Sequence, residues 1–222
     1  MLLVSLAALA MQPAPAVQGA KNARSAEGGS KPVPRGMPQN WITDRDYPMG
    51  SRQRREVGAV AFRVDVDAKG EPAACHILGT SGYEMLDLAI CPLLMKRAHF
   101  APATDVAGKP VADFYDGRFF WLIPGGGHAD LNKLAAEVGR PLPLIVGRPE
   151  LPGSYAHPAL LRVVFFGSKP RSCNVELGTG DAALDAVACE QTMAKIAMPD
   201  LSTQIRPRPD SRMVIVGFEA AK

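Results

Sequence analysis

Residues 60–91 read VAFRVDVDAKGEPAACHILGTSGYEMLDLAIC, and this stretch decides the fold. An apolar side chain stands at every second position from Val60 to Val66, which predicts a strand with one face buried. The three residues 68–70 have turn chemistry, so residues 73–78 are predicted to return as the second strand of a hairpin.

A helix is predicted directly after this hairpin. Ser81 stands where a capping side chain is expected, and Glu84 follows three residues later, as in a capping box. Apolar residues then recur at helical spacing, at Leu86, Ala89, Ile90, Leu93 and Leu94. Further along, residues 118–123 read RFFWLI and predict a third, buried strand. The expected order is therefore strand, strand, helix, strand.

The same order of elements returns 98 residues later in the chain. Cys173 follows Cys75 by 98 positions, and Cys189 follows Cys91 by the same interval. The same offset relates four further pairs, which are Gly82 and Gly180, Leu86 and Leu184, Asp87 and Asp185, and Met95 and Met193. We interpret the chain as an α+β protein of two tandem ββαβ modules, each a small three-stranded antiparallel sheet covered by a helix.

Composition divides the chain into five segments. They are a signal-like apolar leader at 1–19, a flexible linker at 20–40, a first module at 41–124, a linker with a short helix at 125–157, and a degenerate second module at 158–222. The leader resembles a secretory signal but has no basic residue before its apolar run. Export with cleavage and retention as an inner-membrane anchor facing the periplasm both stay open.

The four cysteines form two pairs with identical internal spacing. In an exported protein we expect two structural disulfides, Cys75 with Cys91 and Cys173 with Cys189, each joining a strand to a helix. Zinc sites usually show ligand pairs two to four residues apart, and redox sites often show C-x-x-C. The chain has neither pattern, so disulfides are favoured over metal binding or redox catalysis.

Charge and motifs argue against nucleic-acid binding and against catalysis. A formal net charge of +3 over 222 residues gives no strong electrostatic field. The four histidines are scattered, and the stretch Gly79 to Tyr83 lacks the second glycine of a nucleophile elbow. Gly178-Thr179-Gly180 lacks the lysine of a phosphate loop. We predict no catalytic residue, no cofactor, no metal and no nucleic-acid partner.

An ordered set of short motifs runs from Trp41 to Pro124. The set comprises Tyr47-Pro48, Thr80-Ser81-Gly82, Leu86-Asp87, Arg97-Ala98-His99-Phe100-Ala101-Pro102-Ala103, Gly108-Lys109-Pro110-Val111 and the closing aromatic strand. In this order the motifs resemble the C-terminal domain of TonB-family energy transducers. The second module keeps only the cysteines, Gly180, Leu184-Asp185 and the strand pattern, so its membership rests on internal repetition.

The resemblance implies a periplasmic binding domain that captures an extended segment of another protein by adding it as a strand to a sheet edge. A TonB-dependent outer-membrane transporter is the implied partner. By position, the predicted edge residues are Phe114, Tyr115, Arg118, Phe119, Phe120, Trp121 and Leu122. The alternative is a structural or self-associating envelope protein, for example a homodimer, without energy coupling, and an enzyme of unrecognised type comes third.

Overall fold

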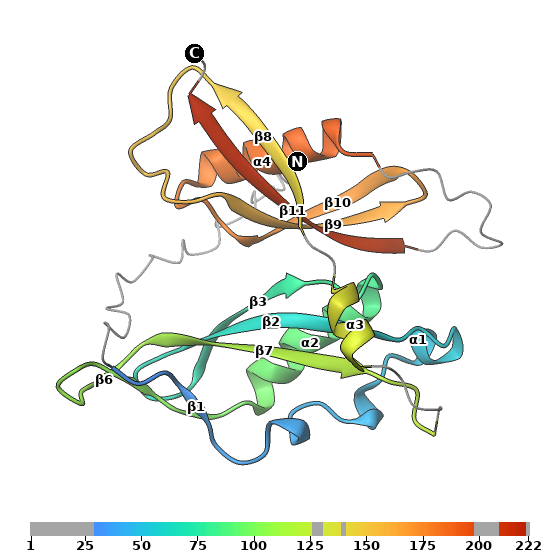
Figure 1. The fold of residues 1–222 in the computed structure, drawn as a ribbon, viewed down its shortest axis with the longest axis vertical. Helices are drawn as coiled ribbons and strands as arrows, with labels where there is room; N and C mark the ends of the chain where they lie inside the picture. Colours follow the sequence, from blue (N-terminus) through green and yellow to red (C-terminus); the bar gives the residue numbers. More distant parts are fainter. Residues whose placement is uncertain (1–28, 126–130, 139–140, 198–208, 221–222) are drawn as a thin grey trace, which may run out of the picture.

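The computed structural model describes residues 29–125, 131–138, 141–197 and 209–220 (Figure 1). The predicted leader and residues 20–28 of the predicted linker lie outside the described residues. Within the described residues the chain forms two α+β modules, which lie one above the other in Figure 1. The fold class expected from the sequence is confirmed, with one correction in the second sheet.

The first module is a three-stranded antiparallel sheet with a helix against one face. The sheet has the order β3-β2-β7, from β2 (Gly58–Val66), β3 (Pro72–Gly79) and β7 (Asp113–Trp121). Helix α2 (Glu84–Arg97) packs on it through buried Leu86, Ile90 and Leu94. The remaining short elements are β1 (Val33–Pro34), η1 (Pro38–Asn40), η2 (Asp44–Asp46), α1 (Met49–Gln53), β4 (Phe100–Ala101), β5 (Ala103–Thr104) and β6 (Pro110–Val111).

The hairpin between β2 and β3 forms where the sequence predicts a turn. The Asp67 carboxylate accepts hydrogen bonds from the backbone N–H groups of Lys69 and Glu71, at 2.8 and 3.0 Å. Gly70 has φ of +90°, and a Cβ there would lie 2.1 Å from the Phe100 carbonyl oxygen. Only glycine therefore fits the turn, because its conformation is left-handed and its surroundings are crowded.

The first module begins earlier than the sequence indicates. Residues 29–40 were expected to belong to the flexible linker, but β1 pairs with β4 and Ser30 bridges to Thr104. Lys31 also forms an ion pair with the buried carboxylate of Asp113, at 2.9 Å. These contacts attach the segment to the first module.

The second module repeats the unit and adds a strand. Its sheet has the order β10-β9-β11-β8, from β8 (Leu142–Arg148), β9 (Ala159–Phe166), β10 (Lys169–Leu177) and β11 (Pro209–Ala220). Helix α4 (Ala182–Lys195) covers one face through Leu184 and Ala188. The expectation of three strands is wrong here, because β8 comes from the predicted linker and pairs with β11 in parallel. That linker also contains α3 (Leu131–Glu137), which contacts β2.

The two helices correspond at the offset of 98 residues, since 84 and 97 plus 98 give 182 and 195. An aspartate one turn into each helix holds the preceding loop. Asp87 accepts from the backbone N–H of Ser81 at 2.8 Å, and Asp185 accepts from that of Thr179 at 2.6 Å. The predicted capping role of Ser81 is wrong, because Tyr83 is the N-cap and the Ser81 hydroxyl donates to Asp87.

The modules contact each other through the sheet face of the second module that α4 leaves uncovered. Met213 of β11 is buried in the core of the first module, and Leu160 packs against that core. The Ser211 backbone N–H donates to the Gly82 carbonyl at 3.2 Å. The second module therefore lies along β3, the terminal strand opposite β7 (Figure 1).

Candidate protein-binding edge

Strand β7 is a terminal strand of its sheet, and β2 is its strand partner. Within the described residues, no further strand is paired with its other side. A terminal strand presents backbone N–H and C=O groups that another chain can pair with. The second module lies against β3, so its described residues do not occupy the edge of β7.

A groove with a volume of about 310 Å³ runs beside β7. Its walls come from β7, from α2 through Leu94, and from an N-terminal strap, which we define as residues 38–46. The lining residues are Pro38, Gln39, Trp41, Ile42, Phe62, Leu94, Tyr115, Arg118, Phe119 and Phe120. Most of these side chains are apolar, so the groove suits an apolar side chain of an incoming segment.

The predicted edge residues do not share one environment. Tyr115 and Phe119 pack partly against the core, and Phe120 is half-buried. Trp121 is buried in the core, and its indole N–H donates to the Leu86 carbonyl at 3.1 Å. Leu122 follows the end of β7. The structure therefore brings Tyr115, Arg118, Phe119 and Phe120 to the groove, whereas Trp121 is buried in the core.

Charged side chains surround the start of β7. The Arg63 guanidinium lies 3.7 Å from the centre of the Phe114 ring, and the Lys31 ammonium lies 4.3 Å from it. Arg63 also forms two hydrogen bonds with Asp116, at 2.7 and 2.8 Å. Phe114 is thus held between cations, whereas Arg118 is exposed further along the strand.

Ionic contacts fix the strap that forms one groove wall. Arg97 of α2 donates to both carboxylate oxygens of Asp46, at 2.7 and 2.8 Å, and to the Trp41 carbonyl at 3.1 Å. The Arg97 hydrogen bonds hold the pKa of Asp46 well below its usual range. Behind the strap, Tyr47 donates to the Glu56 carbonyl, and burial raises the pKa of Tyr47 to about 12. The sequence predicts that the first module begins at Trp41. No sequence pattern indicated that the strap forms a wall of the groove.

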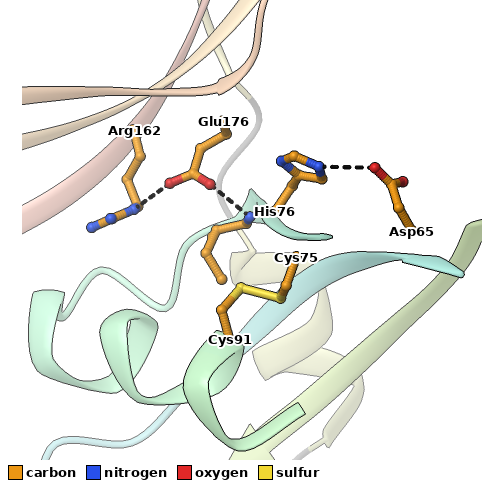
Figure 2. Close-up of a disulfide and its surroundings, with 7 residues drawn as sticks. Asp65, Cys75, His76, Cys91, Arg162 and Glu176 are labelled. Atoms are coloured by element: carbon orange, nitrogen blue, oxygen red, sulfur yellow. Dashed lines mark hydrogen bonds and ion pairs between the residues drawn. A yellow bond between two sulfur atoms is a disulfide. The ribbon is translucent and has the colours of Figure 1, made fainter. Parts of the chain in front are cut away.

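Two disulfides join strand to helix in the pairing that the sequence predicts. Cys75 is bonded to Cys91 and Cys173 to Cys189, each across 16 residues, with Cα–Cα distances of 5.5 and 5.8 Å. Figure 2 shows the first bond between β3 and α2. Each bond holds its helix against the sheet.

An ion pair of the second module reaches into the first beside that disulfide (Figure 2). Glu176 accepts from Arg162 at 2.8 Å and from the backbone N–H of Ile77 at 2.9 Å. Ile77 belongs to the terminal strand β3, so a side chain of the second module accepts a hydrogen bond from one backbone N–H of this strand. Next to it, a hydrogen bond with Asp65 at 3.2 Å raises the pKa of His76.

The first module fits a known domain family. Residues 43–119 match the family described as the Gram-negative bacterial TonB protein C-terminal. The first module is a TonB C-terminal-type domain. TonB C-terminal domains are periplasmic protein-interaction domains, and the match covers α2, most of β7 and residues 43–46 of the strap, whereas the strap residues that line the groove precede it. No curated protein and no solved structure matches the chain.

Neither a metal-binding cluster nor a membrane-spanning helix occurs within the described ranges. There, no group of three or more His, Cys, Asp or Glu side chains could hold a metal ion. None of the helices in the same ranges has the length and apolar character needed to cross a bilayer.

Proposed function

We propose that this chain is a periplasmic, non-enzymatic protein-binding protein that captures an extended segment as an added strand on β7. A TonB-dependent outer-membrane transporter is the first partner to test. The observation that carries the proposal is the terminal position of β7 in a TonB C-terminal-type domain, with the second module seated at the opposite edge.

The groove supports this proposal because it adds side-chain recognition to main-chain pairing. An added strand would present alternate side chains to the α2 side of the sheet, where Phe62, Tyr115 and Phe119 line the groove. Strand addition usually takes affinity from the main-chain hydrogen bonds and specificity from such pockets.

A second support comes from the corresponding strand of the repeat. In the first sheet Val64 pairs with both Cys75 and Tyr115; in the second, Val163 pairs with both Cys173 and Arg212. Tyr115 therefore corresponds to Arg212, and β7 corresponds to β11. Strand β11 does accept an additional strand, β8, on the side away from β9.

The proposal is tested by removing backbone N–H groups from β7 one at a time. In an antiparallel pair, successive residues direct their backbone groups alternately toward and away from the partner strand. Of Arg118→Pro and Phe119→Pro, one will break the β2 ladder and destabilise the module. The other will remove an outward N–H, and we expect it to reduce partner binding at least tenfold while the fold persists.

Binding is measured by fluorescence anisotropy with labelled peptides from the periplasm-facing segments of TonB-dependent transporters. The matched control is the alanine variant at the same position, Arg118→Ala or Phe119→Ala, because it removes the side chain but keeps the backbone donor. If every folded proline variant bound these peptides like the wild type, capture on β7 would be refuted and the structural alternative favoured.

A further inference from the structure

Strand β8 lies outside the duplicated unit, yet it completes the second sheet. It pairs with β11 along seven residues, from Leu142 opposite Val214 to Arg148 opposite Ala220. The first module has no such strand on β7 within the described residues. The predicted linker thus supplies an added strand to β11, as a partner protein would supply an added strand to β7.

Strand β8 makes the two kinds of contact that an added peptide strand makes, which are backbone pairing and packing of alternate side chains. Leu142, Leu144 and Val146 alternate along the strand and pack into the core formed with α4. The intervening Pro143, Ile145 and Gly147 are exposed. This strand therefore offers main-chain pairing along one side and three aliphatic side chains on one face.

Strand β8 buries few of its side chains completely. Val146 is its one fully buried side chain, while Ile145 is 56% exposed. Proline and glycine weaken strands, because proline lacks the backbone donor and glycine loses more conformational entropy on ordering. Both occur within these seven residues, at Pro143 and Gly147.

We propose that the edge of β11 is a second strand-binding site, which β8 occupies in cis and from which an external segment can displace it. The site takes an extended segment that runs parallel to β11 and carries aliphatic side chains at alternate positions. This inference does not depend on capture at β7, because it concerns the other module and a different strand.

The covalent connection between β8 and the rest of the second module explains why β8 keeps this site occupied in the isolated chain. A short linker holds its segment at an effective concentration of about 1 mM, so an external segment of equal intrinsic affinity must compete with it. For a segment with micromolar intrinsic affinity, occupancy by β8 weakens apparent binding by about 10³-fold. Weakening β8 should open the site.

The test uses the full chain and a fluorescent synthetic peptide with the sequence of residues 141–149. Val146→Asp places a charge at the buried anchor, and Ile145→Asp places the same charge at the adjacent exposed position. We expect Val146→Asp to bind the peptide at least tenfold more tightly than the wild type, and Ile145→Asp to behave like the wild type. Hydrogen exchange should show new protection in residues 209–220.

Two outcomes would overturn the proposal. One is a folded Val146→Asp variant, with both disulfides intact, that gains no peptide binding. The other is equal binding by all three chains with protection confined to residues 113–121, which would assign the peptide to β7 and leave capture there standing.

Hydrogen exchange on the wild type gives a second test that needs no variant. Millimolar unlabelled peptide should speed exchange of the β8 amides by displacing the strand, while the β9 amides keep their protection. If β8 amides exchanged as slowly as those of β9, with or without peptide, the strand would be a permanent part of the sheet and the proposal would fail.

Discussion

The terminal strands β7 and β11 occupy corresponding places in two copies of one unit, yet their edges differ. Beside β7 lies a groove walled by the strap and lined by Tyr115 and Phe119. Beside β11 the corresponding place is filled by β8, which inserts Leu144 and Val146 between β11 and α4. Duplication has preserved the framework of disulfide, helix and loop, while the two edges have diverged.

The two modules are also joined through a shared core, because the second module contributes a side chain to the core of the first. Met213 belongs to β11 but is buried among first-module residues. Both tryptophans of the chain, Trp41 and Trp121, lie in that same core. Tryptophan fluorescence therefore follows the first module alone and can separate the stabilities of the two.

The largest effect is expected from Met213→Ala. Removing a fully buried methionine should cost about 2 to 5 kcal/mol of unfolding free energy. Although Met213 lies in the second module, the loss should appear in urea unfolding followed by tryptophan fluorescence.

Ile215→Ala is the control for that prediction, since Ile215 is also in β11 but is 38% exposed. It should cost less than half as much. An unchanged fluorescence midpoint for Met213→Ala would show that the modules are energetically independent.

Removing either disulfide should have the next largest effect. Cys75→Ser with Cys91→Ser, and Cys173→Ser with Cys189→Ser, each open a loop of the same length. The entropy of loop closure in the unfolded chain then predicts that each double variant loses about 3 kcal/mol of unfolding free energy. The first double variant should shift the fluorescence transition directly. The second should shift a circular dichroism transition and should affect fluorescence only through the loss of Met213 from the first core. Clearly unequal losses would mean that native contacts, rather than loop entropy, set the contribution of one bond.

Much of the framework could be predicted from residues with strong local signals. Alternation from Val60 to Val66, turn chemistry at Gly70 and the cysteine spacing each report on contacts close in sequence. The repeat then extended those inferences to the second module, where no family motif was strong.

The edges could not be predicted in the same way, because they depend on contacts far apart in sequence. Leu142, Leu144 and Val146 alternate as a strand requires, but the prolines around them favoured a linker. Edge strands tolerate proline, so that composition did not exclude β8. Similarly, the pairing of Lys31 with Asp113 spans 82 residues and has no local signature.

The smallest expected effect concerns the strap and depends on pH. Because Arg97 lowers the pKa of Asp46 in the folded state, the ion pair stabilises the fold above the ordinary aspartate pKa of 3.8. That contribution decreases progressively as pH falls from this value toward the lower folded-state pKa, because the unfolded chain takes up the proton first. Asp46→Asn should therefore be less stable than the wild type at pH 7, by much less than a disulfide variant, and the difference should shrink below pH 4.

Urea unfolding between pH 7 and pH 2.5 measures this difference, with Asp44→Asn as the control. Asp44 lies in the same short helix, is exposed, and is not a partner of Arg97. Asp46→Asn should also weaken peptide binding at β7, because Asp46 and Arg97 hold the strap that bears Trp41 and Ile42. If stability fell but binding did not, the strap would support the first module without forming part of its recognition surface.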